Sequence, residues 1–179
     1  PDAKITVIDT NNASVGNGLI VKYAAKLVKA GKSHEEVLKG INDAIKKTQI
    51  YVVLDNLDSA VKGGRLNPSV KIVSDFLNLK PIMSIKKDGS LGPIGAMWGK
   101  KNVVNKISKF ILKKLDDSKK YDIAIAHSVC EENAELLRKL LYDKSKNIKS
   151  ISILELGCAL GSHTGAATLA VGIQEHLTI

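Results

Sequence analysis

The sequence has little of what marks several classes of protein. Only two of its 179 residues are cysteine, four are proline and 4% are aromatic. Two cysteines are too few for a disulfide scaffold, which fits a reducing cytosol. No apolar run approaches the ~20 residues that a membrane span needs, and the first ten residues lack the pattern of a secretory signal. We therefore expect a globular, cytoplasmic protein.

Arginine is also scarce, although the chain is basic. The sequence has 27 Lys and Arg against 18 Asp and Glu, a net charge of +9, but Arg65 and Arg138 are its only arginines. Few planar guanidinium groups, few aromatic rings and no RNP-like motif argue against nucleic-acid recognition. The lysines remain compatible with an acidic protein partner, an anionic ligand or a transient contact with a membrane surface.

Predicted strands and helices alternate along the chain. Capping boxes at Ser33–Glu36 and Ser128–Glu131 mark two helix starts, and Asp88-Gly89 marks the turn of a hairpin. A glycine-rich loop is expected from Gly157 to Gly165. This order predicts an α/β protein with a mixed sheet. The expected strands cover residues 4–9, 50–55, 81–97 (as a hairpin), 121–127, 151–157 and 167–175, and the other helices cover about 18–30, 57–62, 68–77 and 100–115.

The best candidate for a domain boundary is near residues 46–49, where a predicted helix gives way to a strand. Residues 1–48 are then the remainder of an N-terminal α/β domain, and residues 49–179 form a C-terminal α/β domain. One strand and two helices are too small to bury a core alone. We therefore expect more of the first domain upstream.

Two other binding patterns stay open. Gly16-Asn17-Gly18 lies between a predicted strand and a helix, as a dinucleotide loop does, but Val21 occupies the position of the third glycine. The pairs His127/Cys130 and Cys158/His163 follow two predicted strands and together form a set that suits zinc, although their spacing is loose.

Gly161-Ser162-His163-Thr164-Gly165 is the sharpest local signal in the sequence. It combines an imidazole, two hydroxyls and two glycines between two predicted strands. Such a loop can direct side chains and backbone amides toward one carboxylate or phosphate. The competing interpretation is a tight connection with a surface histidine.

At this loop the sequence resembles the DegV family of bacterial fatty-acid-binding proteins. Matching motifs occur in family order over nearly the whole chain. Two departures are clear: the Ser/Thr-rich segments that precede these motifs in the family have no match, and Ala166-Ala167 replaces a common Pro-Gly pair. The matching motifs are residues 7–10, 13–18, 62–66, 79–82, 126–127 and 161–165.

The resemblance implies a two-domain α/β protein, of which this chain is the larger C-terminal part, that holds a long-chain fatty acid between its domains. It also implies that a fatty acid kinase phosphorylates the bound carboxylate, so that this chain is a carrier without a catalytic residue, cofactor or metal. The alternative is a kinase or phosphotransferase domain for a small molecule, because related folds occur in dihydroxyacetone kinase.

The resemblance and the residue types together predict the ligand site. The polar residues are expected near the carboxylate, Arg65 is expected beside it at the surface, and the aliphatic and thioether side chains are expected to line the acyl tunnel. The predicted ligand-binding residues are His163, Thr164, Gly165, Ser162, Ser14, Gly16, Arg65, Ile82, Met83 and Met97.

Overall fold

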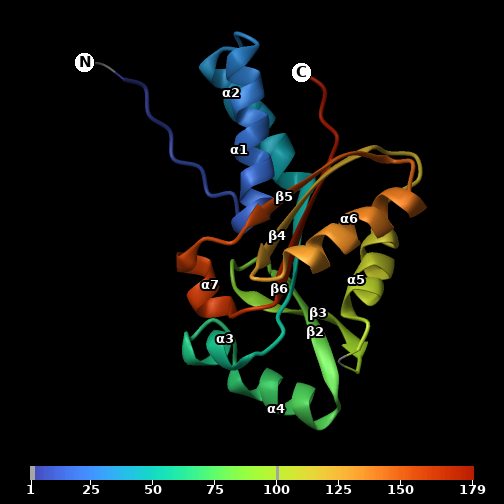
Figure 1. Cartoon of the computed structure of the whole chain (residues 1–179). Coiled ribbons are helices and arrows are strands. Elements are labelled where there is room, and N and C mark those ends of the chain that lie inside the picture. Colours follow the sequence, from blue (N-terminus) through green and yellow to red (C-terminus); the bar gives the residue numbers. More distant parts are fainter. Residues whose placement is uncertain (1–2, 100) are drawn as a thin grey trace.

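A computed structural model describes residues 3–99 and 101–179 (Figure 1). The strands are β1 (Thr48–Val53), β2 (Leu79–Ile85), β3 (Leu91–Trp98), β4 (Tyr121–Ser128), β5 (Ile148–Glu155) and β6 (Thr168–Glu175). The helices are α1 (Ser14–Lys29), α2 (His34–Lys46), α3 (Asp58–Lys62), α4 (Pro68–Phe76), α5 (Val103–Leu112), α6 (Glu131–Lys144) and α7 (Cys158–Thr164).

The described strands form one six-stranded sheet in the order β3-β2-β1-β6-β4-β5. Only β4 and β5 pair in parallel, and the other neighbours are antiparallel. The hairpin of β2 and β3 turns at Gly89, whose φ of +81° suits glycine. The predicted α/β class with a mixed sheet is confirmed.

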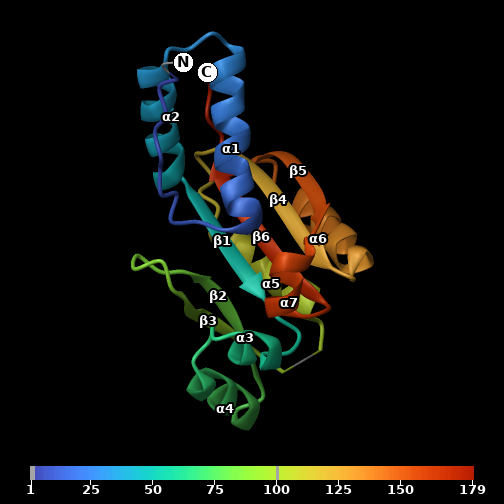
Figure 2. The ribbon, with the colours of Figure 1, turned by 90° about the vertical axis from the view of Figure 1, so that its left-hand side faces the viewer.

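Helices cover both faces of the sheet (Figure 2). Helices α5 and α6 lie on one face, where Ile107, Ile125 and Leu137 are completely buried in the larger core. Helix α1 lies on the other face, where Val15 and Leu19 pack with Ala124 and Ala126 of β4. Because side chains alternate along a strand, β4 contributes large residues to the first face and small ones to the second.

Helices α1 and α2 form a hairpin with a small core of its own. Tyr23 and Leu27 pack there with Ala44 of α2. The capping box predicted at Ser33–Glu36 is present and begins α2. The Tyr23 hydroxyl donates a hydrogen bond of 3.2 Å to the carbonyl of Thr178. The predicted domain boundary between residues 48 and 49 stays a prediction.

Two local predictions are wrong. Residues 4–9 form no strand, because no described segment pairs with their backbone, and Val7 is 94% exposed (Figure 1). Ser128 does not cap α6: it ends β4, and the N-cap is Cys130, whose side chain makes no capping hydrogen bond. Pairing in the sheet therefore extends past the point where the capping motif predicts a helix start.

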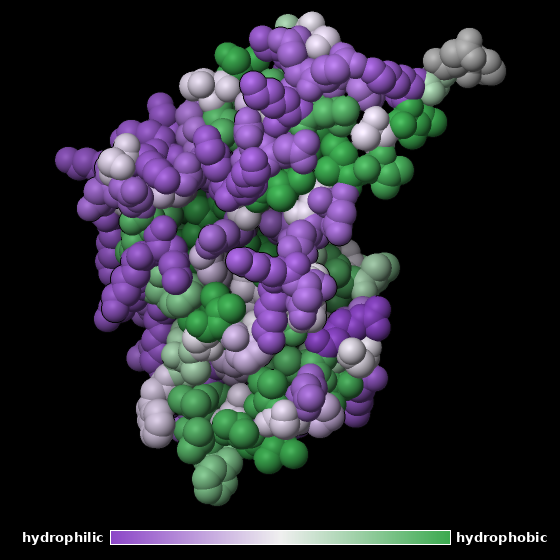
Figure 3. All heavy atoms as spheres, turned by 180° about the vertical axis from the view of Figure 1, so that it is seen from behind, coloured by the Kyte–Doolittle hydropathy of each residue, from purple (hydrophilic) through white to green (hydrophobic). Residues whose placement is uncertain are grey.

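Helix α4, expected over residues 68–77, leaves much of its apolar surface exposed. It begins at Pro68 as expected, but it buries Ser74 and leaves Phe76 88% exposed. Figure 3 shows hydrophobic side chains at the surface at this end of the molecule. The sequence therefore predicts the helix, but its apolar residues do not mark the side that is buried. None of the described helices combines the length and the apolar character that a bilayer crossing requires.

Candidate functional site

Two of the glycine-containing motifs lie side by side. Helix α3, which precedes Gly63-Gly64, contacts α7, which ends in the Gly161–Gly165 motif. The predicted loop at 157–165 is wrong in part, since residues 158–164 form helix α7. His163, in its last turn, lies so close to Gly63 that a Cβ there would be 2.5 Å from the imidazole Nδ1. Gly165 ends α7 with a φ of +76°, and a Cβ on it would lie 3.4 Å from the Ser59 hydroxyl oxygen. The positive φ of Gly165 therefore favours glycine there, and a larger residue at position 63 would have to displace the His163 imidazole.

Arg65 and Ser162 are both exposed at this meeting point. The Arg65 guanidinium donates a hydrogen bond of 2.7 Å to the carbonyl of Gly63, two residues earlier in the same loop. The Ser162 hydroxyl donates to the carbonyl of Ala159, at 3.1 Å. Neither side chain is buried, so both are accessible from solvent.

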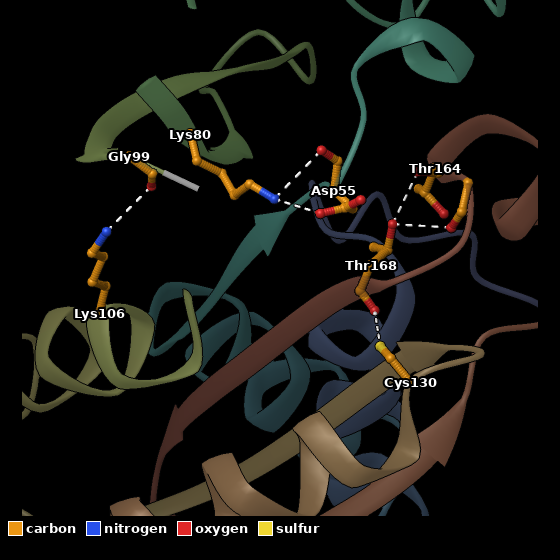
Figure 4. A network of polar contacts seen from close by, with 8 residues as sticks. Asp55, Lys80, Gly99, Lys106, Cys130, Thr164 and Thr168 are labelled. Atoms are coloured by element: carbon orange, nitrogen blue, oxygen red, sulfur yellow. Dashed lines mark hydrogen bonds and ion pairs between the residues drawn. The ribbon is translucent and has the colours of Figure 1, made fainter. Parts of the chain in front are cut away.

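Thr164 carries a hydroxyl without a hydrogen-bond partner among the described residues. Its Oγ1 atom is buried, although the residue as a whole is only partly buried. Its carbonyl is occupied, since the Thr168 hydroxyl lies 3.0 Å from it and 3.1 Å from the Gly165 carbonyl (Figure 4). A buried hydroxyl without a partner is unfavourable. The hydrogen-bonding capacity of this atom is therefore not used by the described residues.

A groove of about 430 Å³ runs between α1, β4, β5 and the start of α7. Its lining is mostly apolar, and small side chains on the strands make room for it. Ser14, the first residue of α1, lies at this groove with a φ of +48°. The lining includes Ser14, Gly18, Leu19 and Lys22 of α1, Ala124 and Ala126 of β4, Ser152 and Leu154 of β5, and Leu160 of α7.

Gly16 has a packing role. A Cβ on it would lie 3.1 Å from the Ile50 Cβ and would also collide with the Asn12 side chain. On the facing strand, a Cβ on Gly172 would lie 3.0 Å from the Gly16 nitrogen. The start of α1 therefore rests directly on the sheet, and the Gly16-Asn17-Gly18 segment does not have the open backbone that a dinucleotide loop needs.

The three predicted tunnel residues do not share a surface. Ile82 and Met97 belong to the core under α5 and α6, whereas Met83 belongs to the core under α1. Their exposed fractions are 1%, 6% and 0%, respectively. Only Met83 lies on the same side of the sheet as the groove.

An ion pair between Lys80, near the start of β2, and Asp55 was not predicted from the sequence. The ammonium of Lys80 lies 2.6 Å from a carboxylate oxygen of Asp55, which follows β1 (Figure 4). The Lys80 side chain is 5% exposed and that of Asp55 is 61% exposed. A lysine inside a strand is the only signal that the sequence offers for it.

Cys130 lies near this pair. Its thiol donates to the Thr168 carbonyl at 3.4 Å, and burial raises its pKa, as does the charge of Asp55. Within residues 3–99 and 101–179, no three His, Cys, Asp or Glu residues are grouped so that they can hold a metal ion. The pairs His127/Cys130 and Cys158/His163 therefore do not assemble the zinc set.

Known proteins resemble the chain along nearly its whole length. A DegV domain-containing protein of Clostridium perfringens is 34% identical over 171 residues, which are 96% of this chain and 58% of the relative. One from Lactococcus lactis is 32% identical over the same shares. The chain thus spans about three fifths of the length of these relatives.

Solved structures share the fold. The fatty acid binding DegV family protein of Streptococcus agalactiae superposes with a TM-score of 0.84 at 26% identity, covering 99% of this chain and 62% of that one. The fatty acid kinase (Fak) B3 protein of Streptococcus pneumoniae, loaded with linoleic acid, gives 0.86 at 26% identity, with 98% and 62% covered. The family model described as an uncharacterised protein of the DegV family matches residues 1–176, and the chain therefore belongs to the DegV family.

Proposed function

We propose that this protein binds a long-chain fatty acid, with the acyl tail in the groove beside α1. The observation that carries the proposal is the groove itself. Its volume of about 430 Å³ is within the range of ligand pockets, and its lining is mostly apolar. The linoleic acid named for the Streptococcus pneumoniae relative supports the same class of ligand.

The carboxylate is assigned to the region where Ser14 and α7 come together. Ser14 and Leu160 line the same groove, and Thr164, one turn after Leu160, has the buried hydroxyl without a partner. His163 lies beside Thr164 against Gly63 and supplies a second polar group. A hydrogen bond to a charged group contributes about 1.5–3 kcal/mol, so His163→Ala is expected to weaken fatty-acid binding about tenfold.

The chain acts as a carrier, and a fatty acid kinase phosphorylates the carboxylate that it presents. The name of the Streptococcus pneumoniae relative supports this partner class. Arg65 is exposed two residues after Gly63, which lies against His163, and is assigned to the kinase or to the acyl phosphate that forms. Arg65→Lys keeps the charge and loses the planar fork. It should therefore leave fatty-acid binding intact and slow kinase-dependent phosphorylation.

Extraction of the full-length protein, followed by mass spectrometry of the lipid fraction, tests the proposal directly. Two leucine substitutions on α1 then locate the tail. Gly18→Leu places a side chain in the groove without a clash, since no heavy atom lies within 4 Å of its Cβ position. Ala25→Leu, on an exposed part of the same helix, is the control.

We expect Gly18→Leu to reduce long-chain affinity at least about tenfold, and Ala25→Leu to leave it unchanged. Absence of any acyl chain from the purified full-length protein, together with no binding of added fatty acid, would refute the function. Equal affinities of the two variants would place the tail elsewhere in the molecule.

A further inference from the structure

Lys80 occupies an unusual position for a lysine. It lies in strand β2 with its side chain 95% buried, and both acceptors that it contacts belong to Asp55: a carboxylate oxygen at 2.6 Å and the carbonyl at 3.4 Å. An ammonium group carries three N–H donors, and a buried charge is stable only when it is paired and hydrogen-bonded. Lys80 therefore has donor capacity that Asp55 does not use.

Lys80 and Asp55 differ in how far water can replace the partner's charge. The Asp55 side chain is 61% exposed, so water can solvate its carboxylate when the pair opens. Water solvates the Lys80 ammonium less well, because the lysine side chain is 5% exposed. The buried lysine thus requires an anion, whereas the exposed aspartate does not require the lysine.

Lys80 faces a cavity of about 360 Å³ that we call the α5 cavity. Its lining combines three asparagines with aliphatic side chains, and Asp55 is the one carboxylate among its lining residues. The N-cap of α5 makes no side-chain capping bond, and the first turn of this ten-residue helix has no acidic residue. The lining residues used in the following argument are Asp55, Lys80, Asn102, Asn105, Asn133 and Ala167.

We propose that the α5 cavity binds a phosphate-class oxyanion between the Lys80 ammonium and the Asn133 amide. Residues at the start of α5 line the same cavity, and α-helix N-termini favour negative charge. Ala167, three residues after Thr164 in the sequence, lines the α5 cavity. It is distinct from the groove beside α1 and does not depend on fatty-acid binding.

Titration of the 179-residue chain with inorganic phosphate at constant ionic strength, followed by amide NMR, is the test. We expect saturable shifts at Val103, Val104 and Asn105 below about 20 mM phosphate, a range that covers millimolar affinity. Absence of saturable shifts, or shifts centred on Lys71 and Asp75 of α4, overturns the proposal. The second result would place the anion in the neighbouring cavity beside α4, which Lys80 also lines.

Charge variants with opposite expected signs make the test specific. Asn133→Asp adds a negative charge to the cavity and suits the first turn of α6, so it should fold normally and weaken phosphate binding at least about fivefold. Asp55→Asn removes the internal competitor and should strengthen binding by a similar factor. Lys71→Gln removes a partly exposed lysine that pairs with Asp58 and Asp75, and it should change nothing. Equal phosphate affinity of wild type and Asn133→Asp refutes the site.

A comparison of two ligands identifies the source of the oxyanion. Butyl phosphonate carries the same tetrahedral head on a short chain. Tighter binding of the phosphonate than of phosphate assigns the site to the phosphoryl end of a larger molecule, and equal or weaker binding assigns it to free phosphate. Asn133→Asp should weaken both ligands, and a phosphonate signal that this variant does not change counts against the α5 cavity.

Discussion

The two faces of the sheet differ in side-chain size along the same strands. Toward α5 and α6, β4 and β6 direct Ile123, Ile125 and Val171, all at most 1% exposed. Toward α1, the same strands direct Ala124, Ala126 and Ala170, and a groove of about 430 Å³ lies over the alanines of β4. The groove thus forms because the side chains on this face of the strands are small, while the strands themselves are regular.

The face with large side chains contributes mainly to stability, and the face with small side chains provides the space for binding. Close packing on the α5 and α6 face holds the strands in place, because filled cores resist rearrangement. The α1 face can then leave space for a ligand without loss of the sheet. Substitutions on the two faces should accordingly have different consequences, and the following predictions run from the largest expected effect to the smallest.

Ile125→Ala should have the largest effect on stability. Ile125 is completely buried under α6, and truncating such a residue costs about 2–5 kcal/mol because a cavity remains. Leu154→Ala on the neighbouring strand is the matched comparison, since Leu154 is 48% exposed and lines the groove. It should cost less than about 1 kcal/mol. Urea unfolding measures both, and equal losses would break the distinction between the faces.

Gly172→Ala tests the closest approach between α1 and the sheet. The added Cβ would lie 3.0 Å from the Gly16 nitrogen and 3.0 Å from the Val15 carbonyl carbon, which are backbone atoms. Helix α1 must shift, and overpacking of this kind costs about 1–3 kcal/mol. A gain in unfolding free energy, the usual result of replacing glycine in a strand, would show that α1 is not held against β6.

The arrangement of elements was largely predictable from the sequence. Polar turns and capping residues punctuate the chain, so the Ser33–Glu36 box and the Asp88-Gly89 turn placed α2 and the hairpin correctly. The strand at 4–9 failed for a physical reason: a strand exists only where another backbone pairs with it, and β propensity does not supply the partner. The apolar spacing of α4 failed because spacing cannot show which side of a helix is covered.

The candidate site was predictable only in part. His163 was singled out by its glycine-flanked polar loop, and Ser14 and Arg65 by family resemblance, while the meeting of α3 with α7 required the tertiary structure. The Lys80–Asp55 pair links residues 25 positions apart in sequence through sheet pairing, and no local pattern announces it. The groove was missed although its alternation of large and small residues is visible in residues 121–126, because the covering helices were unknown.

Asp122 marks the polar end of the α1 face and should make stability depend on pH. Burial raises the pKa of Asp122, but hydrogen bonds from Ser150 and His176, with the charges of His176 and Lys26, outweigh burial and lower it. The His176 Nδ1 lies 2.6 Å from its carboxylate. A lowered pKa stabilises the fold above the unfolded value of about 3.9, and the stabilisation is lost as pH falls through the folded pKa.

Asp122→Asn should therefore reduce the unfolding free energy at neutral pH by about 1 kcal/mol. The difference from wild type should shrink as the pH falls below about 4 and through the lowered pKa of the folded protein, where the wild-type carboxylate becomes protonated. Asp43→Asn, at an exposed position on α2, is the control and should leave the profile unchanged. A pH-independent difference for Asp122→Asn would mean that packing, and not charge, accounts for the loss.

Gly18→Ala should have the smallest effect, and its sign is opposite to that of Gly172→Ala. Gly18 lies inside α1, and no heavy atom lies within 4 Å of its Cβ position. Alanine should raise the unfolding free energy by about 0.5–1 kcal/mol, because glycine is a poor helix former. Its methyl group fills little of the groove, so fatty-acid affinity should stay within about twofold of wild type. Thermal unfolding of Gly18→Ala and Gly172→Ala side by side checks the signs. A loss of stability in both would mean that α1 lies against its neighbours at Gly18 as well as at Gly16, with no groove beside Gly18.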